Sequence, residues 1–207
     1  SQCYSLESVS ISSSISIIEP YTFQDCSSLK NVFIPSSVTS IKSYAFNGCK
    51  SLEKIKIPSS VISIGDCCFN GCSLIREISI PKSLAESTEF IEIFKNFTSV
   101  KILGNLTRIP NSFFINCYSL KYISIPSTII SIGESAFMNC NNLEKIEIHS
   151  QIEKIGSYSF YGCTSLKSIE IPPTVTLIGH YAFYGCTSLK NVSIPSSVTS
   201  IGYNAFG

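Results

Sequence analysis

The sequence has little net charge, no long apolar run and no catalytic motif, and each absence argues against a class of function. Its 15 Lys and Arg nearly balance 14 Asp and Glu, so the formal net charge is +1. A nucleic-acid partner would need a basic stripe, which this balance argues against. No apolar run approaches the ~18 residues of a membrane span, and no charged and then apolar segment opens the chain as a secretion signal would. No G-x-S-x-G nucleophile motif, phosphate loop or C-x-x-C pair occurs.

The sequence consists almost entirely of one repeated unit. It reads F-x-G-C-x-x-L-x-x-I-x-I-P-x-x-V-x-x-I-G-x-x-A, and its phenylalanine returns in steps of 23 residues. These phenylalanines are Phe23, Phe46, Phe69, Phe114, Phe137, Phe160, Phe183 and Phe206. A fixed period of about 20–29 residues with apolar anchors is typical of a leucine-rich-repeat solenoid.

One copy of the repeat, at about residues 82–102, is degenerate. Ile80 and Ile102 are 22 residues apart, so one residue is missing, and Glu86, Glu89 and Glu92 fall between them. Because the apolar frame agrees on both sides, we interpret residues 1–207 as a single domain without a linker. The chain begins and ends within a copy, which favours a piece of a longer protein whose targeting elements could be missing.

Each copy predicts one short strand. Its Ile-x-Ile pair alternates with a period of two and is β-branched, which favours a strand with both side chains facing the core. About nine such pairs, from Val9/Ile11 to Val192/Ile194, would stack about 4.8 Å apart into one parallel sheet. Proline ends most of these strands. We expect a β-rich, right-handed coil whose return side consists of turns and 3₁₀ segments.

Two sets of residues predict turns. Residue types that tolerate a positive φ recur between the Phe and the Cys of the repeat, and they predict a left-handed turn there. They are Asp25, Gly48, Gly71, Asn116, Asn139, Gly162 and Gly185. A second set predicts another tight bend and consists of Gly65, Gly133, Gly156, Gly179 and Gly202.

Ten cysteines and two histidines could in principle carry chemistry. Eight of the cysteines share one position of the repeat, and Cys67 and Cys68 are additional. Such a ladder spreads sulfur atoms along a line, whereas a metal needs ligands that converge. Parallel Cβ atoms about 4.8 Å apart are also too distant for a disulfide. We therefore predict free, buried thiols, with Cys67 or Cys68 as the exception that could pair locally.

His149 and His180 fall on different parts of the repeat, so they do not predict a catalytic pair. We expect no enzyme activity, no cofactor and no metal site.

The outward residues of the predicted sheet form the candidate partner-binding face. Its first column is basic in the first half and acidic in the second, and two of its members are aromatic. The candidate residues are Phe33, Lys54, Lys56, Glu77, Lys101, Tyr122, Glu147 and Glu170. Exposed aromatic residues anchor interfaces, and solenoids present extended faces to proteins. The alternative is a solvated surface without a ligand.

Three Asn-x-Ser/Thr sequons, at Asn96, Asn105 and Asn191, would be glycosylation sites only in a secreted eukaryotic protein.

Residues 160–179 and 183–202, which share F-Y-G-C-T-S-L-K, resemble the BspA-like class of leucine-rich repeats, also known from a treponemal surface antigen. The resemblance implies a surface-exposed or secreted protein of mucosal bacteria or parasitic protists. It also implies an adhesin-like module that binds a host matrix or cell-surface protein. The repeat motif has no catalytic residues to carry over. The alternatives are a structural spacer or an intracellular scaffold without a ligand of its own. The raw ends of such a coil also predict end-to-end self-association.

Overall fold

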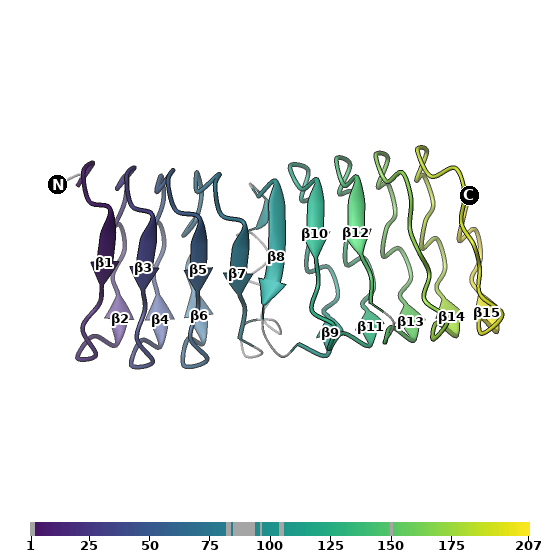
Figure 1. Ribbon diagram of the computed structural model, residues 1–207, viewed down its shortest axis with the longest axis horizontal. Coiled ribbons are helices and arrows are strands. Elements are labelled where there is room, and N and C mark those ends of the chain that lie inside the picture. Colours follow the sequence, from purple (N-terminus) through teal and green to yellow (C-terminus); the bar gives the residue numbers. More distant parts are fainter. Residues whose placement is uncertain (1–2, 82–83, 85–93, 96, 104–105, 150) are drawn as a thin grey trace. The chain divides into compact units, whose positions relative to one another are not determined.

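The computed structural model describes residues 3–81, 84, 94–95, 97–103, 106–149 and 151–207, and only the backbone of residues 77, 79 and 103. It contains two compact units, Ser1–Gly104 and Asn105–Gly207. Within each unit the chain winds in coils, and equivalent strands of successive coils lie side by side (Figure 1). The expected organisation as one domain stays a prediction.

The Ile-x-Ile segments form a first series of parallel strands, as the repeat predicts. In the N-terminal unit these are β1 (Ser8–Ser10), β3 (Asn31–Phe33), β5 (Lys54–Lys56), β7 (Glu77–Ser79) and β8 (Ser99–Leu103). In the C-terminal unit they are β10 (Tyr122–Ser124) and β12 (Lys145–Glu147). Residues 168–170 and 191–193 form no strand in the last two coils, although Ile169 stays buried. The solenoid of parallel strands is therefore confirmed.

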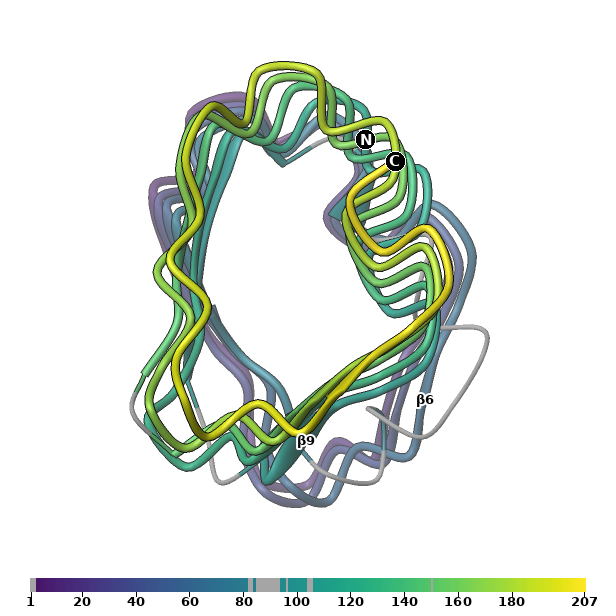
Figure 2. The ribbon, with the colours of Figure 1, turned by 90° about the vertical axis from the view of Figure 1, so that its right-hand side faces the viewer.

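A second series of strands, each two residues long, lies on the return side of the coil. It comprises β2 (Ile17–Ile18), β4 (Ser40–Ile41), β6 (Ser63–Ile64), β9 (Arg108–Ile109), β11 (Ser131–Ile132), β13 (Lys154–Ile155), β14 (Leu177–Ile178) and β15 (Ser200–Ile201). They pair in parallel in the orders β2-β4-β6 and β9-β11-β13-β14-β15. The structure thus adds short strands to the turns expected on this side. Seen down the stack in Figure 2, the coils of the C-terminal unit follow one closed outline.

The register at the degenerate copy differs from the expected one. β7 pairs with β8 so that Ile78 lies opposite Ile102 and Glu77 lies opposite Lys101. The alignment of Ile80 with Ile102 was therefore wrong by two residues, and this copy is one residue longer than the others, not one shorter. The sequence could not show the error because side chains alternate with a period of two. A shift of two keeps the same residues on the core face.

The recurrent phenylalanines form the centre of the core. Consecutive rings are stacked with centroids 5.0–5.5 Å apart and planes inclined by 2–13°. The rings of Phe46, Phe69, Phe114, Phe137 and Phe160 are completely buried. Because each ring is covered by those of the neighbouring coils, one coil cannot bury its apolar side chains alone.

Both sets of turn residues occupy special positions, for different reasons. The set between Phe and Cys has positive φ angles of 58–77°, as predicted. The second set of glycines allows neighbouring coils to approach each other. A Cβ atom on Gly179 would lie 2.4 Å from the backbone nitrogen of Ser157, and one on Gly202 would lie 2.4 Å from that of His180.

Candidate functional site

The candidate partner-binding face is divided between the two units. The N-terminal unit carries Phe33 on β3, Lys54 and Lys56 on β5, Glu77 on β7 and Lys101 on β8. The C-terminal unit carries Tyr122 on β10, Glu147 on β12 and Glu170 in the following coil. All of these side chains that the structure describes are exposed, because they point away from the isoleucines that fill the core.

In the N-terminal unit the face combines an aromatic ring with positive charge. The ring of Phe33 is 63% exposed, and Phe33 lies opposite Ser10 on the neighbouring strand. The register also places Lys54 opposite Glu77, and Glu77 opposite Lys101, so the charges of this column alternate. Alternation avoids repulsion between like charges on neighbouring strands.

In the C-terminal unit the face combines a tyrosine with acidic residues. Tyr122 is 47% exposed and lies opposite Lys145. The Lys145 ammonium is 3.7 Å from the carboxylate of Glu147 on the same strand. Both of these charged side chains are largely exposed, so the pair contributes little to stability and remains accessible to a partner.

Beside this face an ion pair joins two coils. Lys167 Nζ donates a hydrogen bond of 2.6 Å to Glu144 Oε2. The lysine lowers the pKa of Glu144, and the glutamate raises the pKa of Lys167.

The three sequons are placed unequally. Asn191 is exposed in the C-terminal unit. Asn96 and Asn105 lie outside the described residues, as does the acidic segment Glu86–Glu92. Glycosylation at any of them stays a prediction.

The cysteine ladder belongs to the core. All ten cysteines are free thiols, of which Cys3 is exposed and Cys67 half-buried. Five thiols of the ladder, in Cys49, Cys72, Cys140, Cys163 and Cys186, each donate to a phenylalanine carbonyl of the preceding coil at 3.0–3.1 Å. Burial raises the pKa of Cys68 and of Cys186 to about 12, so neither is a reactive thiolate at neutral pH.

The two histidines bind backbone atoms of other coils. His149 Nε2 lies 2.7 Å from the carbonyl oxygen of Ile125, and His180 Nδ1 accepts the Tyr203 N–H at 2.8 Å. Within the ranges that the structure describes, no three His, Cys, Asp or Glu side chains converge on a possible metal position. The same ranges contain no helix with the length and hydropathy that crossing a bilayer would require.

The sequence analysis did not identify a cluster of tyrosines in the turns of the C-terminal unit. Tyr158 stacks on Tyr181 with centroids 5.0 Å apart, and Tyr161 stacks on Tyr184 at 5.2 Å. Edge contacts join the two stacks, with Tyr158 5.9 Å from Tyr161 and Tyr181 5.5 Å from Tyr184. Tyr203, 65% exposed, meets the Tyr181 ring edge to face at 5.5 Å. The signal that could have revealed this tyrosine array is the repeated Y-x-F-Y-G of residues 158–162 and 181–185.

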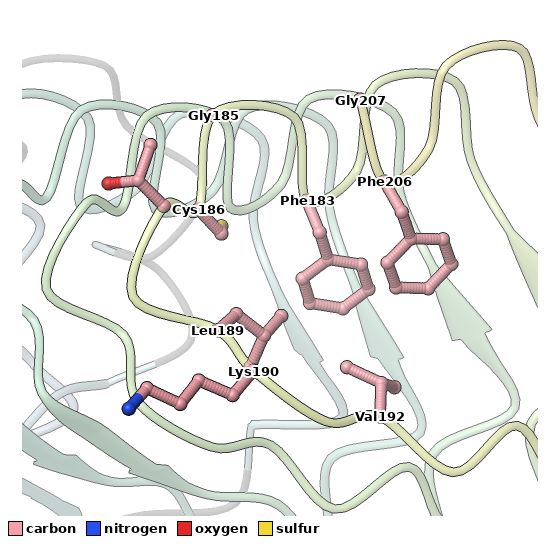
Figure 3. Close-up of a pocket in the computed structure, with 9 residues that line it drawn as sticks. Phe183, Gly185, Cys186, Leu189, Lys190, Val192, Phe206 and Gly207 are labelled. Atoms are coloured by element: carbon pink, nitrogen blue, oxygen red, sulfur yellow. The ribbon is translucent and has the colours of Figure 1, made fainter.

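A hollow of about 290 Å³ lies in the last coil of the C-terminal unit (Figure 3). Phe183 and Phe206 point into it beside Leu189 and Val192, and Lys190 lies at its edge. Four of these side chains occupy core positions of the repeat, so the hollow is part of the coil interior and not a separate ligand site.

The geometry defines a class of protein, a leucine-rich-repeat solenoid that presents one variable face in each unit. The chain belongs to the BspA-type leucine-rich repeat family. The family model described as "BspA type Leucine rich repeat region (6 copies)" matches residues 1–93 and 86–207.

Solved structures of bacterial proteins resemble this chain. A leucine-rich cell surface protein from Faecalibacterium prausnitzii A2-165 is 32% identical, with a TM-score of 0.52, over 98% of this chain and 61% of that one. A leucine-rich repeat protein from Bacteroides ovatus ATCC 8483 is 25% identical, with a TM-score of 0.52, over 99% of this chain and 76% of that one. The chain therefore spans less than two thirds of the Faecalibacterium protein. No curated protein matches it.

Proposed function

We propose that this chain is a non-enzymatic protein-binding module of a cell-surface or secreted, adhesin-like protein, and that its partner docks on the strand faces described above. The observation that carries the proposal is the contrast between the two sides of each strand. The inward side repeats the same apolar types in every coil, whereas the outward side changes from coil to coil and exposes Phe33 and Tyr122. Aromatic residues of this kind supply much of the binding energy of protein interfaces.

The charges beside these rings support complementary roles for the two units. In the N-terminal unit, Lys56 and Lys101 would face acidic groups of a partner around the Phe33 ring. In the C-terminal unit, Glu147 and Glu170 would face basic groups around Tyr122. Rim charges of this kind act mainly on association rate and selectivity, so the rings would supply most of the affinity.

Membership of the family and the naming of the Faecalibacterium relative as a cell surface protein support a location at the cell surface or outside the cell. There, a host matrix or cell-surface protein is the partner that we propose.

The test measures binding to a panel of immobilised, purified host matrix proteins by biolayer interferometry. Each face residue is replaced by the residue that lies opposite it on the paired strand, so that the fold is kept. Phe33→Ser copies Ser10, and Glu147→Ser copies Ser124. We expect the Phe33 variant to weaken binding about tenfold or more.

The matched control is Ile62→Thr, which removes a side chain that is 68% exposed on the return side of the N-terminal unit. Thr39 occupies the same place in the preceding coil, where its carbonyl accepts the Ile62 N–H at 2.9 Å. This control should bind normally. Equal binding by all variants would place the site elsewhere, and no binding to any matrix protein would favour the structural spacer.

A further inference from the structure

We propose that the tyrosine array, consisting of Tyr158, Tyr161, Tyr181, Tyr184 and Tyr203, binds a proline-rich segment of a partner protein in the polyproline II conformation. The array lies in the turns and shares no residue with the candidate partner-binding face. It is therefore a second docking site that can be tested separately.

The fold does not require aromatic residues at the strained turn position of the array. Tyr158 and Tyr181 have left-handed backbones, with φ of 56° and 54°. Bulky side chains are disfavoured in this conformation. The equivalent position of other coils holds Ser112 and Ser135 at φ of 57° and 54°, so a small residue meets the same structural need. Strain that the fold does not require points to a function of the side chain.

The rings are held rigidly before any partner arrives. Tyr181 contacts three others of the array, at 5.0 Å to Tyr158, 5.5 Å to Tyr184 and 5.5 Å to Tyr203. Rings that are already fixed lose little conformational entropy on binding, which is the reason why tyrosine is favoured in binding surfaces.

The array lies on a surface without charge. The turns at residues 156–162, 179–185 and 202–207 contain no Asp, Glu, Lys or Arg. Partial desolvation raises the pKa of Tyr181, so its hydroxyl stays protonated at neutral pH and can donate a hydrogen bond. An uncharged surface of apolar rings and hydroxyl donors suits an uncharged partner that is rich in apolar groups and acceptors.

A polyproline II segment has this chemistry. It forms no internal hydrogen bonds, so its backbone carbonyls are free to accept, and its proline rings are apolar. Aromatic surfaces recognise such segments at low entropic cost. A sugar would instead need open ring faces on which to stack, but the faces within each pair are covered by stacking at 5.0–5.2 Å with 10–12° between the planes. The geometry therefore favours the peptide over a glycan.

The test titrates a fluorophore-labelled decaproline peptide with the full chain and follows fluorescence anisotropy. The double variant Tyr158→Ser, Tyr181→Ser installs the residues that the same turn carries in two other coils. We expect it to weaken decaproline binding about tenfold or more. If its thermal melt shows that it does not fold, Tyr158→Phe with Tyr181→Phe replaces it. That variant keeps the rings, removes two hydroxyl donors and should weaken binding several-fold.

The matched control is Tyr21→Ser with Tyr44→Ser in the N-terminal unit. This pair has the same left-handed backbone, with φ of 61° and 60°, and the same stacking, at 5.2 Å. It lacks the second pair of rings, because Gln24 and Asn47 stand where Tyr161 and Tyr184 stand. The control should bind decaproline normally.

Three outcomes would overturn the proposal: no decaproline binding by the native chain, equal loss in the control, or binding of a labelled glycine–serine peptide of the same length with equal affinity. Binding of a soluble β-linked oligosaccharide in place of decaproline would overturn it in favour of a glycan site. Phe33→Ser should bind decaproline normally, so failure of this proposal and failure of the strand-face proposal can be distinguished.

Discussion

Ser159 occupies a completely buried position, and its hydroxyl oxygen has no hydrogen-bond partner in the described structure. Other coils hold alanine at the same position of the repeat, as Ala136 and Ala182. A buried hydroxyl without a partner costs free energy because it has lost its water.

We predict that Ser159→Ala raises the free energy of unfolding by about 1 kcal/mol, measured by urea denaturation. The matched control is Ser157→Ala, because Ser157 Oγ accepts the His180 N–H at 3.2 Å and its loss should lower stability. Destabilisation by Ser159→Ala would show that the hydroxyl has a stabilising partner.

Phe137 tests the dependence of each coil on its neighbours. Its ring is completely buried between Phe114 at 5.0 Å and Phe160 at 5.1 Å. We predict that Phe137→Ala lowers the free energy of unfolding by about 3–5 kcal/mol, since it removes apolar contacts and leaves a cavity inside the stack. Phe33→Ala, at an exposed ring, should change it by less than about 0.5 kcal/mol. Similar losses in both variants would contradict the interior position of the phenylalanine column.

At the scale of the strands and turns, the repeat pattern predicts the first series of strands because Ile-x-Ile alternates with the period of a strand. It predicts the left-handed turns at Asp25 and Gly48 because their residue types mark positive φ. It misses the equivalent conformation at Tyr181, because tyrosine is not a residue type that signals positive φ. It misses the return-side strands because V-x-x-I has no period of two.

The candidate site was predictable only in part for the same physical reasons. Alternation along a strand predicts which side chains face outward, so Phe33 and Tyr122 are exposed as expected. The neighbours of an outward residue depend on register, and the degenerate copy hides it. Lys101 therefore lies opposite Glu77, although the sequence frame had aligned it with Ser79.

The ion pair between Glu144 and Lys167 gives a pH-dependent contribution at the scale of two adjacent coils. The pKa of Glu144 lies below its ordinary value of 4.5 because Lys167 donates a hydrogen bond to it. Its stabilising contribution is therefore present above pH 4.5 and is lost as the pH falls through the lowered folded-state pKa. The pKa of Lys167 is raised, so its contribution is present below about 10.5 and is lost as the pH rises through the folded-state pKa.

We predict that Lys167→Met returns the pKa of Glu144 toward 4.5, measured by NMR titration of the side-chain carboxyl carbon. Both groups are exposed, so the effect on stability should be small. A carboxyl pKa that does not respond to Lys167→Met would contradict the ion pair.

At the scale of the whole molecule, each unit combines a constant interior with a variable exterior. Stacks that grow by repetition also have two different ends, which are complementary to each other in the way that neighbouring coils are. We therefore predict that the 207-residue chain self-associates end to end, with a sedimentation coefficient that rises with concentration. A coefficient that stays constant at the monomer value would contradict this prediction.

The central claim is that the inward columns carry the fold and the outward residues carry the binding. Its most direct test is one triple variant, Phe33→Ser, Lys56→Ser and Glu147→Ser, in which every new residue copies the one opposite it on a paired strand. Unfolding and matrix-protein binding are measured on the same sample. We predict a free energy of unfolding within about 0.5 kcal/mol per site of the native value, together with loss of binding. Loss of folding, or binding equal to that of the native chain, would contradict the claim.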